Sequence, residues 1–335
     1  MLLYSKVAVA TNLYVVNNVT GSLSEYSIDR NTGLLTAIGS ATGMVAAVGV
    51  QVDPLGRFVY VAATTPPRIH RFAPDASGVL SLLGTTTPNS TFPEALAFDP
   101  TGAYLYGVIA GNNTVEGFSV SAAGDLTSVG TAAAAAGGIS LRVHPSGRFM
   151  YTTNGGASTI SSYSLNAFSG APTNTSNPAA GGSTPQGMAL DPSGNFLYVA
   201  NSAGTPNIAI FSINQSTGVP SLVTTINSTS VWGVIVDPTG QYVYTTNQGA
   251  SNAVFAYRRD SATGLLTQIG SAPAGTTPYY LAIDPQSQFL YASNNNAASQ
   301  FVSEYRIVGG IPVSIGTIPA GSGGYFLDLM TKYSY

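Results

Sequence analysis

Hydrophobic and polar positions alternate along the chain in short runs that recur from one end to the other. Residues 57–61 (Arg-Phe-Val-Tyr-Val) and 195–199 (Asn-Phe-Leu-Tyr-Val) are two examples. Runs of this length with a period of two predict β-strands. Between them stand Asp-Pro-Thr-Gly segments, as at 99–102, in which Asp caps the turn, Pro presets φ and Gly closes it. With a second turn of the Ser-Thr-Gly kind, as at 216–218, each copy is predicted to hold four strands.

Three columns of residues repeat in step, at spacings of 45 to 47 residues in the first. The first holds Tyr14, Tyr60, Tyr106, Tyr151, Tyr198, Tyr244 and Tyr291. The second holds Tyr26, Phe72, Phe118, Tyr163, Phe211, Tyr257 and Tyr305. The third holds Gly33, Gly78, Gly124, Gly170, Gly218, Gly264 and Gly310. A period near 46 with four short strands is typical of a propeller blade. We therefore expect an all-β fold, a seven-bladed β-propeller of four-stranded antiparallel blades, in one domain over residues 1–335.

The two ends of the chain complement each other. The first copy starts at its second strand, residues 13–17, after what we expect to be an N-terminal extension over residues 1–10. Residues 325–330 align with 279–284, the inner strand of another copy. The C-terminal strand is therefore predicted to join the first blade and close the ring, which also removes a sheet edge.

The composition of the chain argues against several classes of function. Charged residues are 7% of the chain, where about 25% is usual, and the net charge is -3 without a block of like charge. We expect no binding to nucleic acid and, without a long apolar run, no membrane span. The absence of cysteine and the presence of two histidines, His70 and His144, predict no metal site, and we expect no cofactor. A surface rich in Ser, Thr, Asn and Gly favours an extracellular, cell-surface or periplasmic location.

An acid or histidine precedes proline at six blade turns, at Asp53, Asp99, His144, Asp191, Asp237 and Asp284. Turn capping explains all six better than a ring of metal ligands.

Two charges are not explained by the repeat: Arg142 and Asp328 share one inner-strand position. The other blades carry Gln51, Ala97, Ala189, Ile235 and Ala282 there. Because buried charges need partners, the two either pair structurally or contact a ligand.

Aromatic residues that the repeat does not require gather where inner strands begin in three neighbouring blades. They are Trp232, Tyr279, Tyr280, Tyr325 and Phe326. The opposite side of the predicted channel mouth carries Val48, Glu94, Ile139 and Gln186. Aromatic faces with polar tips suit a small-molecule or carbohydrate ligand, so Glu94, Gln186 and the five aromatics are the predicted binding residues. The alternative is that the aromatics pack on one another and plug the channel.

Residues 197–201 (Leu-Tyr-Val-Ala-Asn) and 243–247 (Val-Tyr-Thr-Thr-Asn), each after Asp-Pro-x-Gly, resemble the YVTN-type propeller repeat. This repeat occurs in lactonases of the 6-phosphogluconolactonase type and in bacterial and archaeal cell-surface proteins. The resemblance covers residues 13–330 and implies a lactonase site at the channel mouth, with an Arg-His pair in one blade and a His in the blade before it. Here Gln186, Gly187 and Ile139 stand at those positions.

Two functions stay open at this point. The first is a non-catalytic exported or cell-surface propeller that binds a ligand or protein partner, or builds a surface assembly. The second is a lactonase-type hydrolase with Glu94 and Arg142 as its candidate catalytic residues, acting through a water. The missing Arg and His groups favour the first, because lactone hydrolysis needs a base and donors for the oxyanion.

Overall fold

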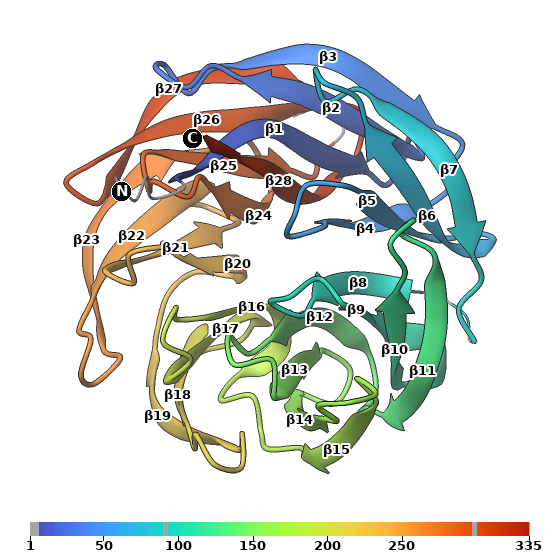
Figure 1. The fold of residues 1–335 in the computed structure, drawn as a ribbon. Coiled ribbons are helices and arrows are strands. Elements are labelled where there is room, and N and C mark those ends of the chain that lie inside the picture. The colour runs from blue at the N-terminus through green and yellow to red at the C-terminus, as the bar shows by residue number, and fades with distance from the viewer. Residues whose placement is uncertain (1–6, 90, 92, 297–299, 335) are drawn as a thin grey trace, which may run out of the picture.

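The computed structural model describes residues 7–89, 91, 93–296 and 300–334. Its strands form seven four-stranded sheets, arranged as blades around a common axis (Figure 1). Every pair of neighbouring strands in a blade is antiparallel. The predicted seven-bladed propeller is confirmed. In the described part of the chain, the one helical element is the short 3-10 helix η1 (Ala110–Asn112), and no helix is long and apolar enough to cross a bilayer.

Each blade runs from an inner strand at the axis to an outer strand at the rim. Blade 1 consists of β28 (Gly324–Ser334), β1 (Val7–Asn17), β2 (Ser22–Ile28) and β3 (Leu35–Thr42). Blade 2 consists of β4 (Ala47–Val52), β5 (Val59–Thr64), β6 (Pro67–Pro74) and β7 (Leu80–Thr86). Blade 3 consists of β8 (Pro93–Phe98), β9 (Tyr104–Ile109), β10 (Thr114–Val120) and β11 (Leu126–Ala133). Blade 4 consists of β12 (Gly138–Val143), β13 (Phe149–Asn154), β14 (Thr159–Leu165) and β15 (Pro172–Ser176).

The remaining three blades follow the same order. Blade 5 consists of β16 (Ser183–Leu190), β17 (Phe196–Ala203), β18 (Ile208–Ile213) and β19 (Pro220–Ile226). Blade 6 consists of β20 (Val231–Val236), β21 (Tyr242–Asn247), β22 (Ala253–Arg259) and β23 (Leu266–Pro273). Blade 7 consists of β24 (Pro278–Ile283), β25 (Phe289–Asn294), β26 (Phe301–Val308) and β27 (Ile311–Pro319).

The ring closes through the two ends of the chain, as expected. Strand β28 pairs with β1 in a ladder that runs from Val7 opposite Ser334 to Asn17 opposite Gly324. Residues 7–10, which the sequence assigned to an extension, are therefore part of β1, whereas residues 1–6 lie outside the described residues. Closure leaves no inner sheet edge open at the junction.

The proline turns are capped as predicted. In blade 3 the Asp99 carboxylate accepts hydrogen bonds from the backbone N–H of Thr101 at 3.1 Å and of Tyr104 at 2.7 Å. In blade 4 His144 takes over this role, because its Nδ1 accepts from the N–H of Ser146 at 3.1 Å. Among the described residues, no three His, Asp or Glu side chains gather in a group that could hold a metal ion.

The tyrosine and glycine columns meet between neighbouring blades. Every tyrosine of the first column donates a hydrogen bond of 2.6 to 3.1 Å to the carbonyl oxygen of a glycine in the third column, in the next blade. The glycine is needed for two reasons at Gly33: its φ is +79°, and a Cβ would lie 2.1 Å from the ring of Phe289. These contacts explain why both columns repeat.

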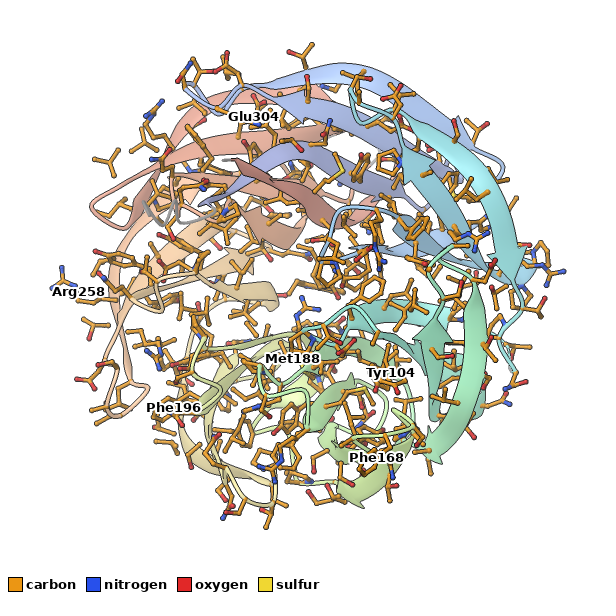
Figure 2. All side chains as sticks on the ribbon, in the orientation of Figure 1. Tyr104, Phe168, Met188, Phe196, Arg258 and Glu304 are labelled. Carbon is orange, nitrogen blue, oxygen red and sulfur yellow. The ribbon has the colours of Figure 1, made fainter. Side chains whose placement is uncertain are left out.

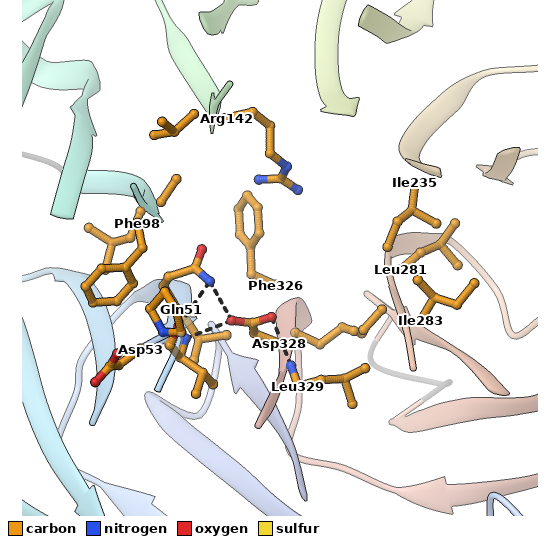
Figure 3. Close-up of a pocket in the computed structure, with 18 of the residues that line it drawn as sticks. Gln51, Asp53, Phe98, Arg142, Ile235, Leu281, Ile283, Phe326, Asp328 and Leu329 are labelled. Carbon is orange, nitrogen blue, oxygen red and sulfur yellow. Dashed lines mark hydrogen bonds between the residues drawn. The ribbon is translucent and has the colours of Figure 1, made fainter. Parts of the chain in front are cut away.

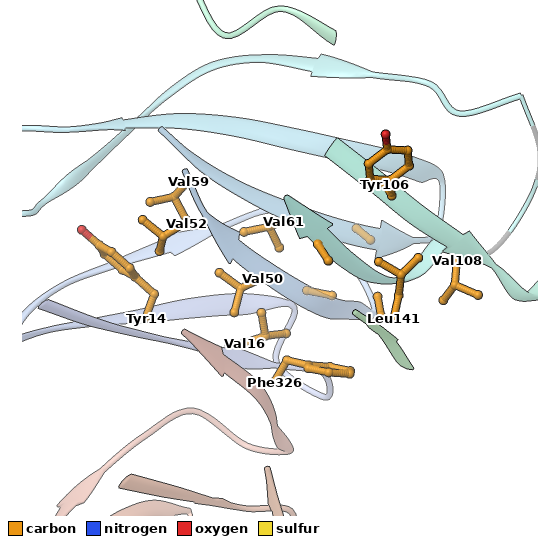
Figure 4. Close-up of a cluster of buried hydrophobic side chains, with 14 of the residues drawn as sticks. Tyr14, Val16, Val50, Val52, Val59, Val61, Tyr106, Val108, Leu141 and Phe326 are labelled. Carbon is orange, nitrogen blue, oxygen red and sulfur yellow. The ribbon is translucent and has the colours of Figure 1, made fainter. Parts of the chain in front are cut away.

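The core lies between the blades. Figure 4 shows side chains of blades 1 to 4 packed together, and Val16, Val61 and Val108 among them are fully or almost fully buried. In Figure 2, Met188 lies near the centre of the ring, whereas Arg258 projects from its rim. Strands such as β5 and β13 are buried at every position, so polar and apolar residues do not alternate strictly along them.

Arg259 and Asp191 form an ion pair inside this core. The guanidinium of Arg259 on β22 forms an ion pair of 2.7 Å with Asp191 of blade 5, and both side chains are almost fully buried. Arg259 also donates to the Tyr198 hydroxyl and to the Gly240 carbonyl oxygen, each at 2.9 Å. The guanidinium therefore ties blade 6 to blade 5.

Candidate active site

The inner strands share a local irregularity at their start. Each of them shifts register against its neighbour there, which is the mark of a β-bulge. The residues at these bulges, called the entrance residues from here on, are Val48, Glu94, Ile139, Gln186, Trp232, Tyr279 and Tyr325. A bulge lets two consecutive side chains leave the regular alternation, so Tyr279 and Tyr280 contact the same aromatic neighbour, Tyr325.

Hydroxyl groups fix three of the entrance residues. The Thr246 hydroxyl on β21 accepts a hydrogen bond from the N–H of Gly233 in its own blade at 2.7 Å. It donates to the carbonyl oxygen of Tyr279 in the next blade at 2.6 Å. We call this arrangement the hydroxyl relay. It recurs at Thr153, between Ser140 N and Gln186 O, and at Ser293, between Tyr280 N and Tyr325 O.

The five predicted aromatics form one continuous cluster, the aromatic arc. Ring centroids lie 4.5 Å apart for Trp232 and Tyr279, and 4.8 Å apart for Tyr279 and Tyr325. Tyr280 and Phe326 stack at 3.9 Å with an interplanar angle of 19°. These rings are close enough to stabilise one another without a ligand.

Within the arc, burial separates two layers. Tyr280 and Phe326 are 5% and 8% exposed, so neither offers a free face at the entrance. Trp232, Tyr279 and Tyr325 keep part of their surface accessible. The arc thus packs on itself, and its ligand-binding role stays a prediction that rests on these three outer rings.

Glu94 faces the arc from blade 3. Its side chain is partly buried, and burial raises the pKa of its carboxyl group. Burial, and to a lesser degree the negative charge of Glu94, raises the pKa of the Tyr279, Tyr280 and Tyr325 hydroxyls, so the carboxylate lies within electrostatic range of all three. Among the described residues, the Glu94 carboxylate has no hydrogen-bond or ion-pair partner.

The tyrosine hydroxyls near Glu94 stay protonated at neutral pH. Burial is the main cause, and it raises the pKa of Tyr279 to about 12 and those of Tyr280 and Tyr325 further. The Tyr279 hydroxyl interacts with that of Tyr325, whereas the buried Tyr280 hydroxyl has no partner among the described residues. These groups are neutral hydrogen-bond donors beside a carboxylate.

The positions of the absent Arg-His pair have other roles here. Gln186 is 5% exposed and donates through Nε2 to the Ser202 hydroxyl at 3.3 Å. A Cβ at Gly187 would lie 2.7 Å from the carbonyl oxygen of Trp232, so the next blade fills the space of a side chain. The close approach of blades 5 and 6 thus demands glycine at this point.

A cavity of about 480 Å³ lies further along the axis, below the aromatic arc. It is lined by the later halves of the inner strands and by Phe326, Arg142 and Asp328 (Figure 3). We call it the inner cavity. In the described residues Arg142 and Asp328 form no direct ion pair, because Asp328 is held by backbone and Gln51 donors instead. Sequence reasoning singled out both charges but placed no cavity between the strands.

The two candidate catalytic residues lie in different parts of the channel. Glu94 interacts electrostatically with the tyrosines of the arc, whereas Arg142 interacts with Tyr280 and Asp328. Both charges act on Tyr280: after burial, which raises the pKa of its hydroxyl, Arg142 lowers that pKa and Glu94 raises it. The entrance therefore holds a carboxylate with tyrosine donors, and the guanidinium belongs to the inner cavity.

Comparison with known proteins identifies the family. A family model described as a lactonase, 7-bladed beta-propeller, matches residues 8–140, 93–236, 204–277 and 241–310. The chain belongs to this lactonase family. The 6-phosphogluconolactonase of Pectobacterium carotovorum subsp. carotovorum (strain PC1) is 27% identical to this lactonase-family propeller over 187 residues. That match covers 52% of this chain and 56% of the relative, so the chain spans little more than half the length of this curated relative.

Solved structures share the fold of this lactonase-family propeller over nearly its whole length. A Bacteroides uniformis protein, provisionally named a 6-phosphogluconolactonase, superposes with a TM-score of 0.84 at 18% identity, covering 96% of this chain and 99% of that one. The periplasmic gluconolactonase of Pseudomonas aeruginosa superposes with a TM-score of 0.82 at 17% identity, covering 97% and 99%.

These findings correct the function favoured by the sequence. The missing Arg and His groups pointed to a non-catalytic scaffold, but the lactonase family model and the named relatives support the alternative, a lactone hydrolase. The absence of one arrangement of polar groups does not exclude lactone hydrolysis. A base and oxyanion donors can come from other residue types, tyrosine among them.

Proposed function

We propose that this protein hydrolyses a lactone without a phosphate group at the channel entrance, with Glu94 as the general base. The observation that carries the proposal is the Glu94 carboxylate itself, which is partly buried, has no partner among the described residues and lies within electrostatic range of three tyrosine hydroxyls. Burial raises the pKa of Glu94 toward the operating pH, which improves a general base.

In the proposed reaction, Glu94 takes a proton from a water molecule as the water oxygen attacks the lactone carbonyl carbon. The negative charge that develops on the carbonyl oxygen is stabilised by hydrogen bonds from the Tyr279 and Tyr325 hydroxyls. The ring C–O bond then breaks, and protonated Glu94 returns the proton to the leaving oxygen. The product is a hydroxycarboxylic acid, and Glu94 is restored.

The residues around Glu94 support a neutral substrate. No Lys, Arg or His is among the seven entrance residues, so nothing there would neutralise a phosphate. The exposed parts of Trp232, Tyr279 and Tyr325 offer flat apolar surface with polar tips, which suits a sugar ring or an aromatic lactone. The hydroxyl relays hold the backbone of Tyr279 and Tyr325, and so help to orient the two donors.

The test is hydrolysis of glucono-δ-lactone, dihydrocoumarin and 6-phosphogluconolactone by the purified chain, with the spontaneous rate subtracted. We expect saturable turnover of a neutral lactone and a loss of about a hundred- to ten-thousand-fold in Glu94→Gln. Asp125→Asn is the control, because Asp125 is an exposed carboxylate in the turn before β11 that pairs with Arg71 on β6. Lack of turnover of every lactone, or full activity of Glu94→Gln, would overturn the proposal.

A further inference from the structure

The inner cavity differs from the entrance in its lining and its opening. None of the entrance residues lines it, whereas Pro54 and Pro100, in the turns after β4 and β8, do. It therefore reaches the end of the channel where the inner strands finish, opposite to the entrance. A volume of about 480 Å³ is within the range of small-molecule sites.

Asp328 is held in a fixed orientation in this cavity. Its Oδ2 accepts hydrogen bonds of 2.7 Å from the backbone N–H of Val52 and from Gln51 Nε2. Its Oδ1 accepts one hydrogen bond of 2.9 Å, from the backbone N–H of Leu329. Because a carboxylate oxygen can accept more than one hydrogen bond, Oδ1 retains acceptor capacity toward the cavity.

Arg142 faces the same cavity from blade 4. Figure 3 shows its guanidinium directed inward, above the ring of Phe326. Its one hydrogen bond to a described residue runs from Nη1 to the carbonyl oxygen of Leu141 at 2.8 Å, and it forms no ion pair there. Most of its N–H donors are therefore free to bind an anion, which would offset the cost of holding this cation among apolar side chains.

The fold does not require the charge of Arg142 or that of Asp328. At the equivalent inner-strand position the other five blades carry uncharged residues, and those blades have the same four strands. The rest of the lining is mixed, with the aliphatic residues Ile235, Leu281 and Ile283 on the side away from Gln51 (Figure 3) and the turn-capping carboxylates Asp53 and Asp99 at its end. A fixed acceptor and a cation with free donors, beside an aliphatic wall, are the features of a site for a small amphipathic molecule.

We propose that the inner cavity is a second binding site, for a small hydroxycarboxylate. The carboxylate binds Arg142, the hydroxyl donates to Asp328 Oδ1, and the carbon skeleton packs against Ile235, Leu281 and Ile283. A monoanion fits better than a phosphate dianion, because Arg142 is the one cation among the described residues of the lining, whereas Asp53, Asp99 and Asp328 repel each negative charge that the ligand carries. This site is separate from the proposed catalytic entrance and does not depend on it.

The experiment is isothermal titration calorimetry of lactate, 3-hydroxybutyrate and mandelate into the full chain at millimolar concentrations. We expect saturable one-to-one binding of at least one acid and none of its neutral amide. Arg142→Met weakens binding at least about tenfold, since a charge-assisted bidentate contact is lost. Arg148→Met is the matched control, because Arg148 is an exposed arginine of the same blade, stacked on Phe149.

Two further variants test the contact with Asp328 and the independence of this site from the entrance. Asp328→Asn reduces the preference for the hydroxy acid over its deoxy analogue, and Glu94→Gln leaves binding unchanged, which separates this site from the entrance. Absence of saturable binding by all three acids, unchanged affinity in Arg142→Met, or loss of binding in Glu94→Gln overturns the proposal. If Arg142→Met fails to fold, Arg142→Lys replaces it, and unchanged affinity there is the contrary result.

Discussion

The hydroxyl of Tyr291, in blade 7, donates a hydrogen bond of 2.8 Å to the carbonyl oxygen of Gly33, in blade 1. The two residues are 258 positions apart in the chain, yet their contact repeats the one that joins every other pair of neighbouring blades. The junction of the chain ends is therefore tied twice, by this hydrogen bond near the middle of the blades and by the pairing of β28 with β1 near the axis.

Tyr291→Phe tests the first of these ties. We expect a loss of about 1 kcal/mol in the free energy of unfolding, because one buried hydrogen bond disappears while the ring stays packed. Tyr151→Phe is the control, since Tyr151 makes the same bond to Gly218 at 2.8 Å within the chain. Denaturant titration gives both values, and an unaffected Tyr291→Phe beside a destabilised Tyr151→Phe would speak against closure as described.

Removal of residues 325–335 tests the second tie. Blade 1 would lose its inner strand, the burial of Leu327 and Met330 and the partner of β1. We expect a lower thermal midpoint for the whole protein rather than local fraying of one blade, because each blade packs on both neighbours. Calorimetry of the full and shortened chains measures this, and an unchanged midpoint with unchanged cooperativity would be the contrary outcome.

Arg259→Met should destabilise the protein by about 3–5 kcal/mol, because it leaves the Asp191 carboxylate buried without its partner. The adjacent Arg258 is exposed on the rim, so Arg258→Met should change stability by no more than about 0.5 kcal/mol. Urea unfolding of the two variants measures the difference. Equal effects would mean that the buried ion pair contributes nothing specific to the contact between blades 5 and 6.

The proposed general base predicts a pH profile for lactone hydrolysis. Burial favours the neutral form of Glu94, so kcat/KM should rise with pH through a midpoint above the ordinary glutamate value of 4.5. The rise reflects formation of the carboxylate, and Glu94→Gln should abolish it. Initial rates corrected for spontaneous hydrolysis provide the profile; a midpoint at or below 4.5 would argue against this base.

Asp328 predicts a pH dependence of stability with a defined sign. Burial raises its pKa from 3.8 to about 6. Below pH 3.8 the group is protonated in both states, but between 3.8 and 6 the folded chain keeps a proton that the unfolded chain has lost. Its contribution to stability therefore falls as pH rises through this window. The thermal midpoint of the native chain should fall relative to that of Asp328→Asn between these pH values, and a constant difference would contradict the shift.

Much of the fold can be predicted from the sequence because every blade repeats the same strands, turn caps and contacts between blades. Tyr60 and Gly124 recur at fixed spacing since the hydroxyl of one meets the carbonyl of the other across a blade boundary. Asp99 recurs because the turn needs an acceptor for its N–H groups, and histidine at position 144 supplies one equally well. Each column of residues reflects one contact that is repeated in all or nearly all of the seven blades. A column of this kind is therefore unlikely to arise by chance.

The candidate site is predicted less well because its side chains lie at the bulges, where the regular alternation of strand side chains is interrupted. Strand alternation would send Tyr279 and Tyr280 to opposite faces, but the bulge in β24 allows both to join the aromatic arc. The layer formed by Tyr280 and Phe326, and the inner cavity below it, depend on that shift. A change of register of this kind leaves no periodic signal in the sequence.

The hydroxyl relays have a consequence for how such a channel can be altered. Thr153, Thr246 and Ser293 each position an entrance residue that belongs to the following blade. A single blade moved into another propeller would carry its entrance side chain without the hydroxyl that orients it. Two adjacent blades must therefore be transferred together to keep an entrance side chain oriented. A chimera whose junction separates two such blades should keep the fold but lose the orientation of that side chain.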